Sequence, residues 1–238
     1  MRRLAWQTGR GPRTRGTTAL YRVMKKFLSC VKQSHDPKHP RKDCGWWYGE
    51  RSLTGLFAAA AWLLSKRDGY GWSLEEFTSE RTRGKRQAAR GRGDLWLLIG
   101  KNKVTIEAKV TWPEQLDDVS KWVGRVNTKL KKAFGQLRNL DTDYHYGRPA
   151  AVCYVVPAIP RRKRTLRDQN PSKSMRRFIQ AMTKDDPRTA VAACWLKDLR
   201  QAPYDWWKDR RHRICYLYPG VAAVVRYKNR WRFSKNHG

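Results

Sequence analysis

Two acidic residues and one lysine have the types and the spacing to act together on a phosphate group. Asp94 begins an apolar run, and Glu107 and Lys109 alternate with apolar residues in the next segment. Because alternate side chains of a strand point to opposite faces of a sheet, Glu107 and Lys109 share a face. Carboxylates are hard oxygen ligands for Mg²⁺, and a nearby ammonium can orient a water or offset negative charge. These residues predict a metal-assisted hydrolytic site.

The apolar pattern also predicts how strands 94–99 and 103–110 pair. A turn of two or four residues around 100–103 is expected to place these residues opposite each other: Ile99 and Val104, Leu97 and Ile106, Leu95 and Ala108, Asp94 and Lys109. A slip of one residue would mix apolar and polar faces, so the pattern selects this register. Asp94, Glu107 and Lys109 then converge on the face opposite the apolar side chains.

A further carboxylate is expected at the same place. A helix is predicted from Glu50, with a buried stripe at three-four spacing formed by Leu53, Leu56, Phe57, Ala60 and Leu64. Glu50 lies on that stripe, and a carboxylate that faces the interior needs a cation or hydrogen-bond donors. A first-turn acid is also favoured by the helix dipole, and that alternative stays open.

The remaining patterns predict an α/β layered domain in which helices cover a mixed sheet. The other expected elements are a short helix at 19–31, a strand at 73–80, a long helix from Pro113 to Leu140, a buried strand at 150–156, a helix at 175–199 broken near 185–187, and a hairpin of 214–218 with 221–227. We expect this domain to span 46–238, after a basic N-terminal arm and short helix at 1–45.

The order of a helix with Glu50, Gly93-Asp94, a hairpin, Glu107-Ala108-Lys109 and a long helix resembles the PD-(D/E)XK nuclease superfamily over roughly residues 50–156. The resemblance implies a restriction-endonuclease-like mixed β-sheet flanked by α-helices. It also implies an endonuclease that hydrolyses phosphodiester bonds in DNA with Mg²⁺ or Mn²⁺. Holliday-junction resolvases and phage-defence nucleases belong to this superfamily.

The same resemblance assigns roles to particular residues. Asp94 and Glu107 would bind the metal with help from Glu50, and Lys109 would assist the attacking water, so these four form the expected catalytic set. Gly93 stands where the family pattern has proline. Gln136 is the nearest counterpart of a polar residue that some members carry on the following helix, although an exposed helix glutamine is the alternative.

The charge of the chain points to a polyanionic partner. Fifty-two lysines and arginines face 20 acidic residues, a formal net charge of +32. Such a charge repels itself on folding and is tolerable where a polyanion is a regular partner, which favours nucleic acid, DNA before RNA. The candidate contacts are Arg81, Arg83, Lys85, Arg86, Arg90, Arg92, Lys129, Lys132, Arg161 and Arg162. The alternative function is a non-catalytic basic protein that binds DNA or structured RNA.

Other sequence features bear on partners and location. No apolar run is long enough to cross a bilayer, so no membrane association is expected. Five cysteines, an odd number, and the lack of a secretory apolar core favour a reducing, cytoplasmic location. Residues 1–35 contain no acid, which an organelle transit peptide would also show.

Two further possibilities concern zinc and oligomeric state. Cys30, His35, His39 and Cys44 have ligand types for zinc but match no common zinc module. A homodimer would be needed to cut both strands together. Trp46-Trp47-Tyr48 and Trp206-Trp207 could contact bases, although buried packing is the alternative.

Overall fold

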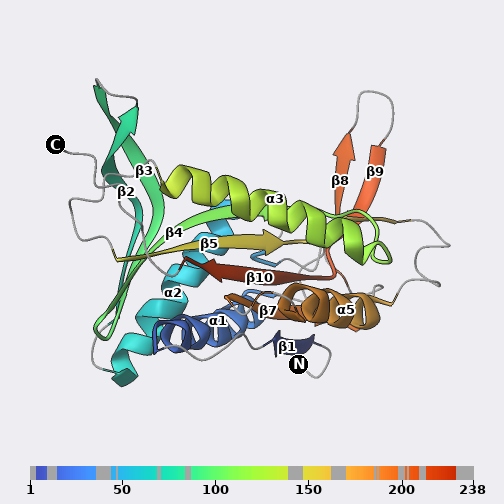
Figure 1. The fold of residues 1–238 in the computed structure, drawn as a ribbon. Helices are drawn as coiled ribbons and strands as arrows, with labels where there is room; N and C mark the ends of the chain where they lie inside the picture. The colour runs from blue at the N-terminus through green and yellow to red at the C-terminus, as the bar shows by residue number, and fades with distance from the viewer. Residues whose placement is uncertain are drawn as a thin grey trace.

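A mixed β-sheet with helices on both faces forms the centre of the molecule (Figure 1). The computed structural model describes residues 4–9, 15–35, 44–46, 48–68, 71–83, 87–138, 147–161, 170–184, 186, 188–197, 202, 204–208 and 213–228. The helices are α1 (Arg15–Gln33), α2 (Glu50–Asp68), α3 (Val119–Leu137) and α5 (Pro171–Lys184). The predicted α/β class with a mixed sheet flanked by helices is thus confirmed at this level.

The described strands form two sheets. They are β1 (Leu4–Gly9), β2 (Gly71–Arg83), β3 (Gln87–Ile99), β4 (Asn102–Thr111), β5 (Arg148–Val155), β6 (Ile159–Pro160), β7 (Thr189–Leu196), β8 (Tyr204–Lys208), β9 (Arg213–Leu217) and β10 (Gly220–Tyr227). The large sheet has seven strands in the order β1-β7-β10-β5-β4-β3-β2, and the small sheet has the order β6-β9-β8. Among the described strands of the large sheet, β4 and β5 are the one parallel pair, and α3 is the crossover between them.

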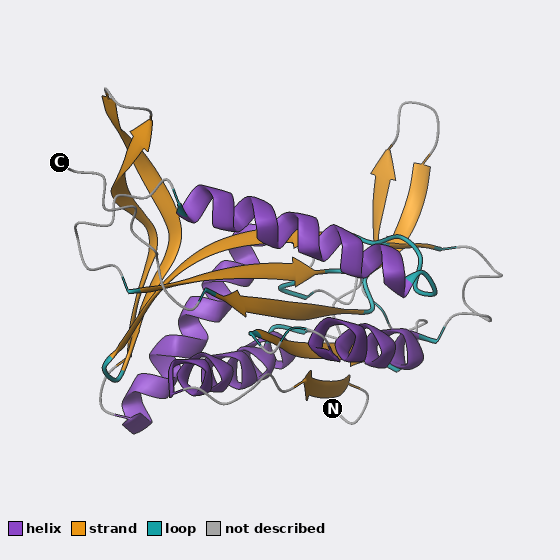
Figure 2. Cartoon of the chain, in the orientation of Figure 1, coloured by secondary structure: helices purple, strands orange, loops and turns teal. Residues whose placement is uncertain are grey.

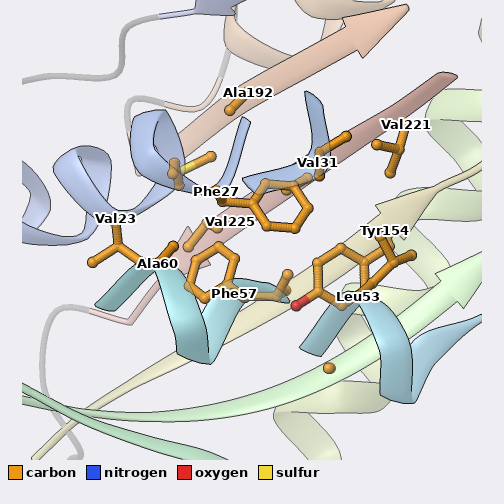
Figure 3. Close-up of a cluster of buried hydrophobic side chains, with 14 of the residues drawn as sticks. Val23, Phe27, Val31, Leu53, Phe57, Ala60, Tyr154, Ala192, Val221 and Val225 are labelled. Atoms are coloured by element: carbon orange, nitrogen blue, oxygen red, sulfur yellow. The ribbon is translucent and has the colours of Figure 1, made fainter. Parts of the chain in front are cut away.

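Each face of the large sheet has its own apolar core. On one face, side chains of α1 and α2 such as Phe27, Leu53 and Phe57 pack on Tyr154 and Val225 of the sheet (Figure 3). On the other face, α3 and α5 pack on the alternate residues of β5, β7 and β10. All residues of β5 after Arg148 are buried, as predicted for a strand covered on both faces. No described helix is both long and apolar enough to cross a membrane.

The hairpin of β3 and β4 has the predicted faces in a different register. Leu95 lies opposite Ile106, Leu97 opposite Val104, and Ile99 opposite Asn102, so the expected register is wrong by two residues. The turn is shorter than the four-residue alternative, and Gly100 has a φ of 58°, which a tight turn favours. A shift of two leaves every side chain on its predicted face because the strand period is two.

Two other expectations about helices are corrected by the structure. The long helix begins at Val119 rather than at Pro113, because the Asp118 carboxylate accepts the Lys121 N–H and caps it. The segment after Pro187 is strand β7, buried between β1 and β10, where burial on both faces overrides the helix propensity of its alanines.

The predicted hairpin around Pro219-Gly220 is also wrong. The chain instead passes there from the small sheet to the large one: β9 pairs with β6 and β8, whereas β10 pairs with β5 and β7. Within the predicted basic N-terminal arm, Leu4–Gly9 forms an edge strand paired with β7. Figure 2 shows this strand beside the N-terminus, at the edge of the sheet.

Candidate active site

The predicted catalytic residues meet where the large sheet splits. β3 and β4 pair only as far as Leu95 and Ile106. Beyond that point β3 continues with β2 alone, and β4 continues with β5. Figure 1 shows β3 curving away from β4 at this place. Asp94 lies at the split on β3, and Glu107 and Lys109 lie at the split on β4.

The Lys109 ammonium lies between carboxylates from three elements. Its Nζ is 3.2 Å from Glu107 Oε1 on the same strand, 3.7 Å from Asp94 Oδ2 on β3, and 3.9 Å from Glu50 Oε1 on α2. Nζ also donates to the carbonyl oxygen of Ala108. The structure therefore brings together all four residues of the expected catalytic set.

Where β3 and β4 separate, backbone N–H groups of β4 donate to the carboxylates in place of a neighbouring strand. The Ala108 N–H, which would face β3 if the ladder continued, donates to Asp94 Oδ2 at 2.7 Å. The Val110 N–H donates to the Glu50 carboxylate. A carboxylate that accepts a backbone N–H is held in one orientation by a charge-assisted bond. The same two donors therefore fix Asp94 and Glu50 beside Lys109.

Burial differs among the members of this cluster. The Glu107 side chain is 2% exposed, whereas Glu50 and Asp94 are 35% and 30% exposed. Glu107 thus lies at the floor and the other two carboxylates line the side open to solvent. A buried carboxylate is tolerable where a cation and hydrogen bonds compensate it, and Lys109 is that cation for Glu107.

Burial is the main influence on Glu50. It raises the pKa of the Glu50 carboxyl above its ordinary value, and the Asp94 carboxylate acts in the same direction. The opposing effects of Lys109, Lys129 and the Val110 N–H do not cancel this rise. Burial likewise raises the pKa of the nearby Cys153 thiol to about 12, so this thiol stays protonated at neutral pH.

The helix after the hairpin contributes to the site from the other side. Lys129 on α3 lowers the pKa of both Glu50 and Cys153, which places its charge near the cluster. It was predicted as a nucleic-acid contact, and its side chain is half-buried in the structure; the assignment stays a prediction. Gln136 is half-buried and its Oε1 has no hydrogen-bond partner, so it is not the exposed glutamine of the alternative.

The donor set suits a hard divalent cation in kind. Three carboxylates supply the oxygen ligands that Mg²⁺ prefers. As arranged, these oxygens surround the Lys109 ammonium, and among the residues that the structure describes no group of three or more His, Cys, Asp or Glu side chains is gathered closely enough to hold a metal. The cluster therefore has the ligand types that a metal prefers, and the Lys109 ammonium lies between its carboxylates.

Much of the predicted nucleic-acid contact set lies outside the described side chains. Lys85, Arg86 and Arg162 lie outside the described residues, and only the backbone is described for Arg81, Arg83, Arg90 and Arg92 on the β2–β3 hairpin. Lys132 on α3 and Arg161 after β6 are exposed, as a phosphate contact requires. These assignments stay predictions.

The remaining sequence candidates have mixed outcomes. Trp46 is fully buried and its Nε1 donates to the Tyr218 carbonyl, so it packs in the core rather than contacting a base. Cys30 and Cys44 are buried thiols, and His39 lies outside the described residues, so the zinc prediction is not tested. Sequence patterns missed Trp112, which is 41% exposed directly after the strand that carries Glu107 and Lys109.

No protein-family model matches the chain, and comparison with curated proteins and with solved structures also yields no match. The geometry of the site and the charge of the chain are therefore what bears on its function.

Proposed function

We propose that the chain is a Mg²⁺- or Mn²⁺-dependent endonuclease of the PD-(D/E)XK type that hydrolyses phosphodiester bonds in DNA. The observation that carries the proposal is the Lys109 ammonium within 3.9 Å of carboxylates from α2, β3 and β4. A protein that merely binds a polyanion gains nothing from carboxylates gathered beside the phosphates. Hydrolysis gives them a use.

The arrangement of elements supports the proposal. The order α2-β2-β3-β4-α3-β5 is the order that the resemblance implies, with the acid of the first helix, the Asp of the hairpin and the Glu-x-Lys strand meeting at one place. The parallel pair β4–β5 with α3 as crossover completes the restriction-endonuclease-like core that we propose.

Each residue of the cluster has a chemical role in this proposal. Asp94 and Glu107, with Glu50, would hold the metal, which when bound makes a coordinated water more acidic and stabilises charge on the phosphoryl oxygens. The Ala108 and Val110 N–H groups keep Asp94 and Glu50 oriented. Lys109 would position the attacking water and offset negative charge in the transition state. Its unbranched side chain can rotate away from the carboxylates it now contacts.

The proposal predicts that cleavage depends on Glu107 and Lys109. Supercoiled, linear, branched and single-stranded DNA should be incubated with the purified chain and Mg²⁺ or EDTA. We expect cleavage with Mg²⁺ alone, and a loss of about a hundredfold or more in Glu107→Gln and Lys109→Ala because each removes a charge aimed at the reacting groups.

Matched controls separate the site from general charge effects. Glu114→Gln removes an exposed acid outside the cluster, and Lys103→Ala removes an exposed lysine of the same strand, β4. Both should cleave like the wild type. Undiminished cleavage by Glu107→Gln and Lys109→Ala would refute the site assignment. If no substrate is cut but DNA is bound tightly, the non-catalytic binding function replaces the proposal.

A further inference from the structure

We infer that Trp112 and Tyr48 form a stacking surface for an unpaired base of the nucleic acid, directly beside the candidate active site. The inference rests on the proposed function, because it names the substrate class of that site. A strand that is single or locally unpaired next to the scissile phosphate is the ligand. Neither residue belongs to the catalytic set.

The position of Trp112 connects it to the site through two elements. It follows Thr111, the last residue of β4, and stands three residues after Lys109. A Cβ built at Gly49 would lie 3.8 Å from Trp112 Cζ2, so the indole lies against the backbone that leads into Glu50. Tyr48 precedes that glycine and is 62% exposed. Two exposed aromatic rings thus flank the entry to α2, where Glu50 faces Lys109.

The backbone that carries Trp112 is held on both sides. The Thr111 carbonyl accepts the Val156 N–H, and the Pro113 carbonyl accepts the Ala158 N–H, both at 2.9 Å. The Trp112 carbonyl itself accepts from Arg125 Nη1 at 3.3 Å. A ring on a fixed backbone loses little freedom when a base stacks on it, and such preorganisation favours binding.

Exposed cations near Trp112 offer contacts for the phosphates of a strand, and the acids Glu114 and Asp118 line the same hollow as these cations. Arg125 and Lys121 are exposed on the first turns of α3, and Arg125 reaches the Trp112 carbonyl. Aromatic rings with neighbouring cations bind single strands because any base offers a flat face while the cations contact phosphates. In a duplex both faces of each base are already covered by its neighbours, so stacking requires an unpaired base.

A fluorescence titration tests the inference without any cleavage. A single-stranded oligonucleotide with one 2-aminopurine is titrated with the wild type in EDTA, and base stacking should quench its fluorescence. We expect Trp112→Ala to weaken single-strand binding about tenfold, the typical loss for one stacked base, and Trp112→Phe to retain most of the affinity. Duplex binding should change much less.

Trp72→Ala is the matched control. Trp72 is 55% exposed but stacks on Trp62 of α2, with ring centroids 6.1 Å apart, and is not part of the proposed surface. The Trp72→Ala variant should bind the oligonucleotide with the affinity of the wild type. No quenching in the wild type, an unchanged affinity in Trp112→Ala, or an equal loss for duplex DNA would each overturn the inference. Because EDTA prevents metal-dependent cleavage, these results do not depend on whether Glu107→Gln abolishes activity.

Discussion

Glu50 lies at the first turn of α2 with its carboxylate half-buried beside Asp94 and Lys109, and burial raises its pKa. A raised pKa means that the folded state binds the proton more tightly than the unfolded state does. The contribution of Glu50 to the free energy of unfolding therefore falls as the pH rises from the unfolded value of about 4.3 through the folded pKa. Above that pH range, the full cost of burying the charged Glu50 carboxylate lowers the free energy of unfolding.

This sign predicts that Glu50→Gln stabilises the metal-free protein at neutral pH. Glutamine can still accept the Val110 N–H but carries no charge to desolvate. Thermal unfolding in EDTA should give a higher Tm for Glu50→Gln than for the wild type at pH 7, with a smaller difference near pH 4. Glu114→Gln, outside the cluster, should not show this pattern. A lower Tm for Glu50→Gln at pH 7 would mean that its ion pair with Lys109 outweighs the burial.

Among the elements, the start of β5 shows how closely the parallel pair is packed. Gly147 has a φ of 93°, and a Cβ there would overlap the carbonyl group of Lys103 at the start of β4. Gly147→Ala should therefore lower the free energy of unfolding by about 2 kcal/mol or more, since both the backbone conformation and the contact become strained.

For Gly124→Ala we expect the opposite change in the free energy of unfolding. Gly124 lies inside α3 and a Cβ there meets open space. Alanine should raise the free energy of unfolding by about 0.5–1 kcal/mol, because glycine loses more backbone entropy in a helix. Urea unfolding of both variants measures the difference. Similar values for the two would contradict the close approach of β4 and β5.

For secondary-structure elements, the local sequence pattern predicts the face on which a side chain lies better than it predicts which strands pair. The parity of β4 places Glu107 and Lys109 on one face whatever the register, so the site residues could be predicted although the register shifted by two. The helical stripe likewise places Glu50. The partners of β7 and β10 depend on contacts between segments far apart in sequence, and their alanine-rich runs fit either a helix or a buried strand.

Trp112 could not be recognised as a surface residue for a related reason. Its exposure depends on where β4 ends and on the packing of Gly49 against its ring, neither of which follows from periodicity. For each of the four cluster residues, the periodicity of its own strand or helix predicts the face on which it lies. The position of Trp112 beside them depends on tertiary structure alone.

For the whole molecule, the effect of the net charge of +32 depends on which surfaces carry the cations. The outer end of β2–β3 and the β8–β9 hairpin extend past α3 at opposite ends of that helix in Figure 1. Between them α3 presents exposed cations, including Lys131 and Lys132. This side of the molecule also carries Lys109 and Glu107, which project from β4 toward the α3 face. On the proposed function, we expect a duplex bound at the site to contact these α3 lysines as well.

The placement predicts a directed salt dependence. Double-stranded DNA binding should weaken steeply between 50 and 200 mM salt, by about 10³-fold or more if at least six phosphates are bound. Lys131→Gln with Lys132→Gln should reduce the slope of log K against log salt by about 0.9 for each phosphate that the variant no longer neutralises. Lys25→Gln with Lys32→Gln removes two exposed lysines of α1, on the opposite layer, and should leave the slope nearly unchanged. Fluorescence anisotropy across that salt range measures both pairs. An equal reduction by both would mean that net charge attracts DNA without a preferred face, and α3 would then have no role in guiding phosphates toward Lys109.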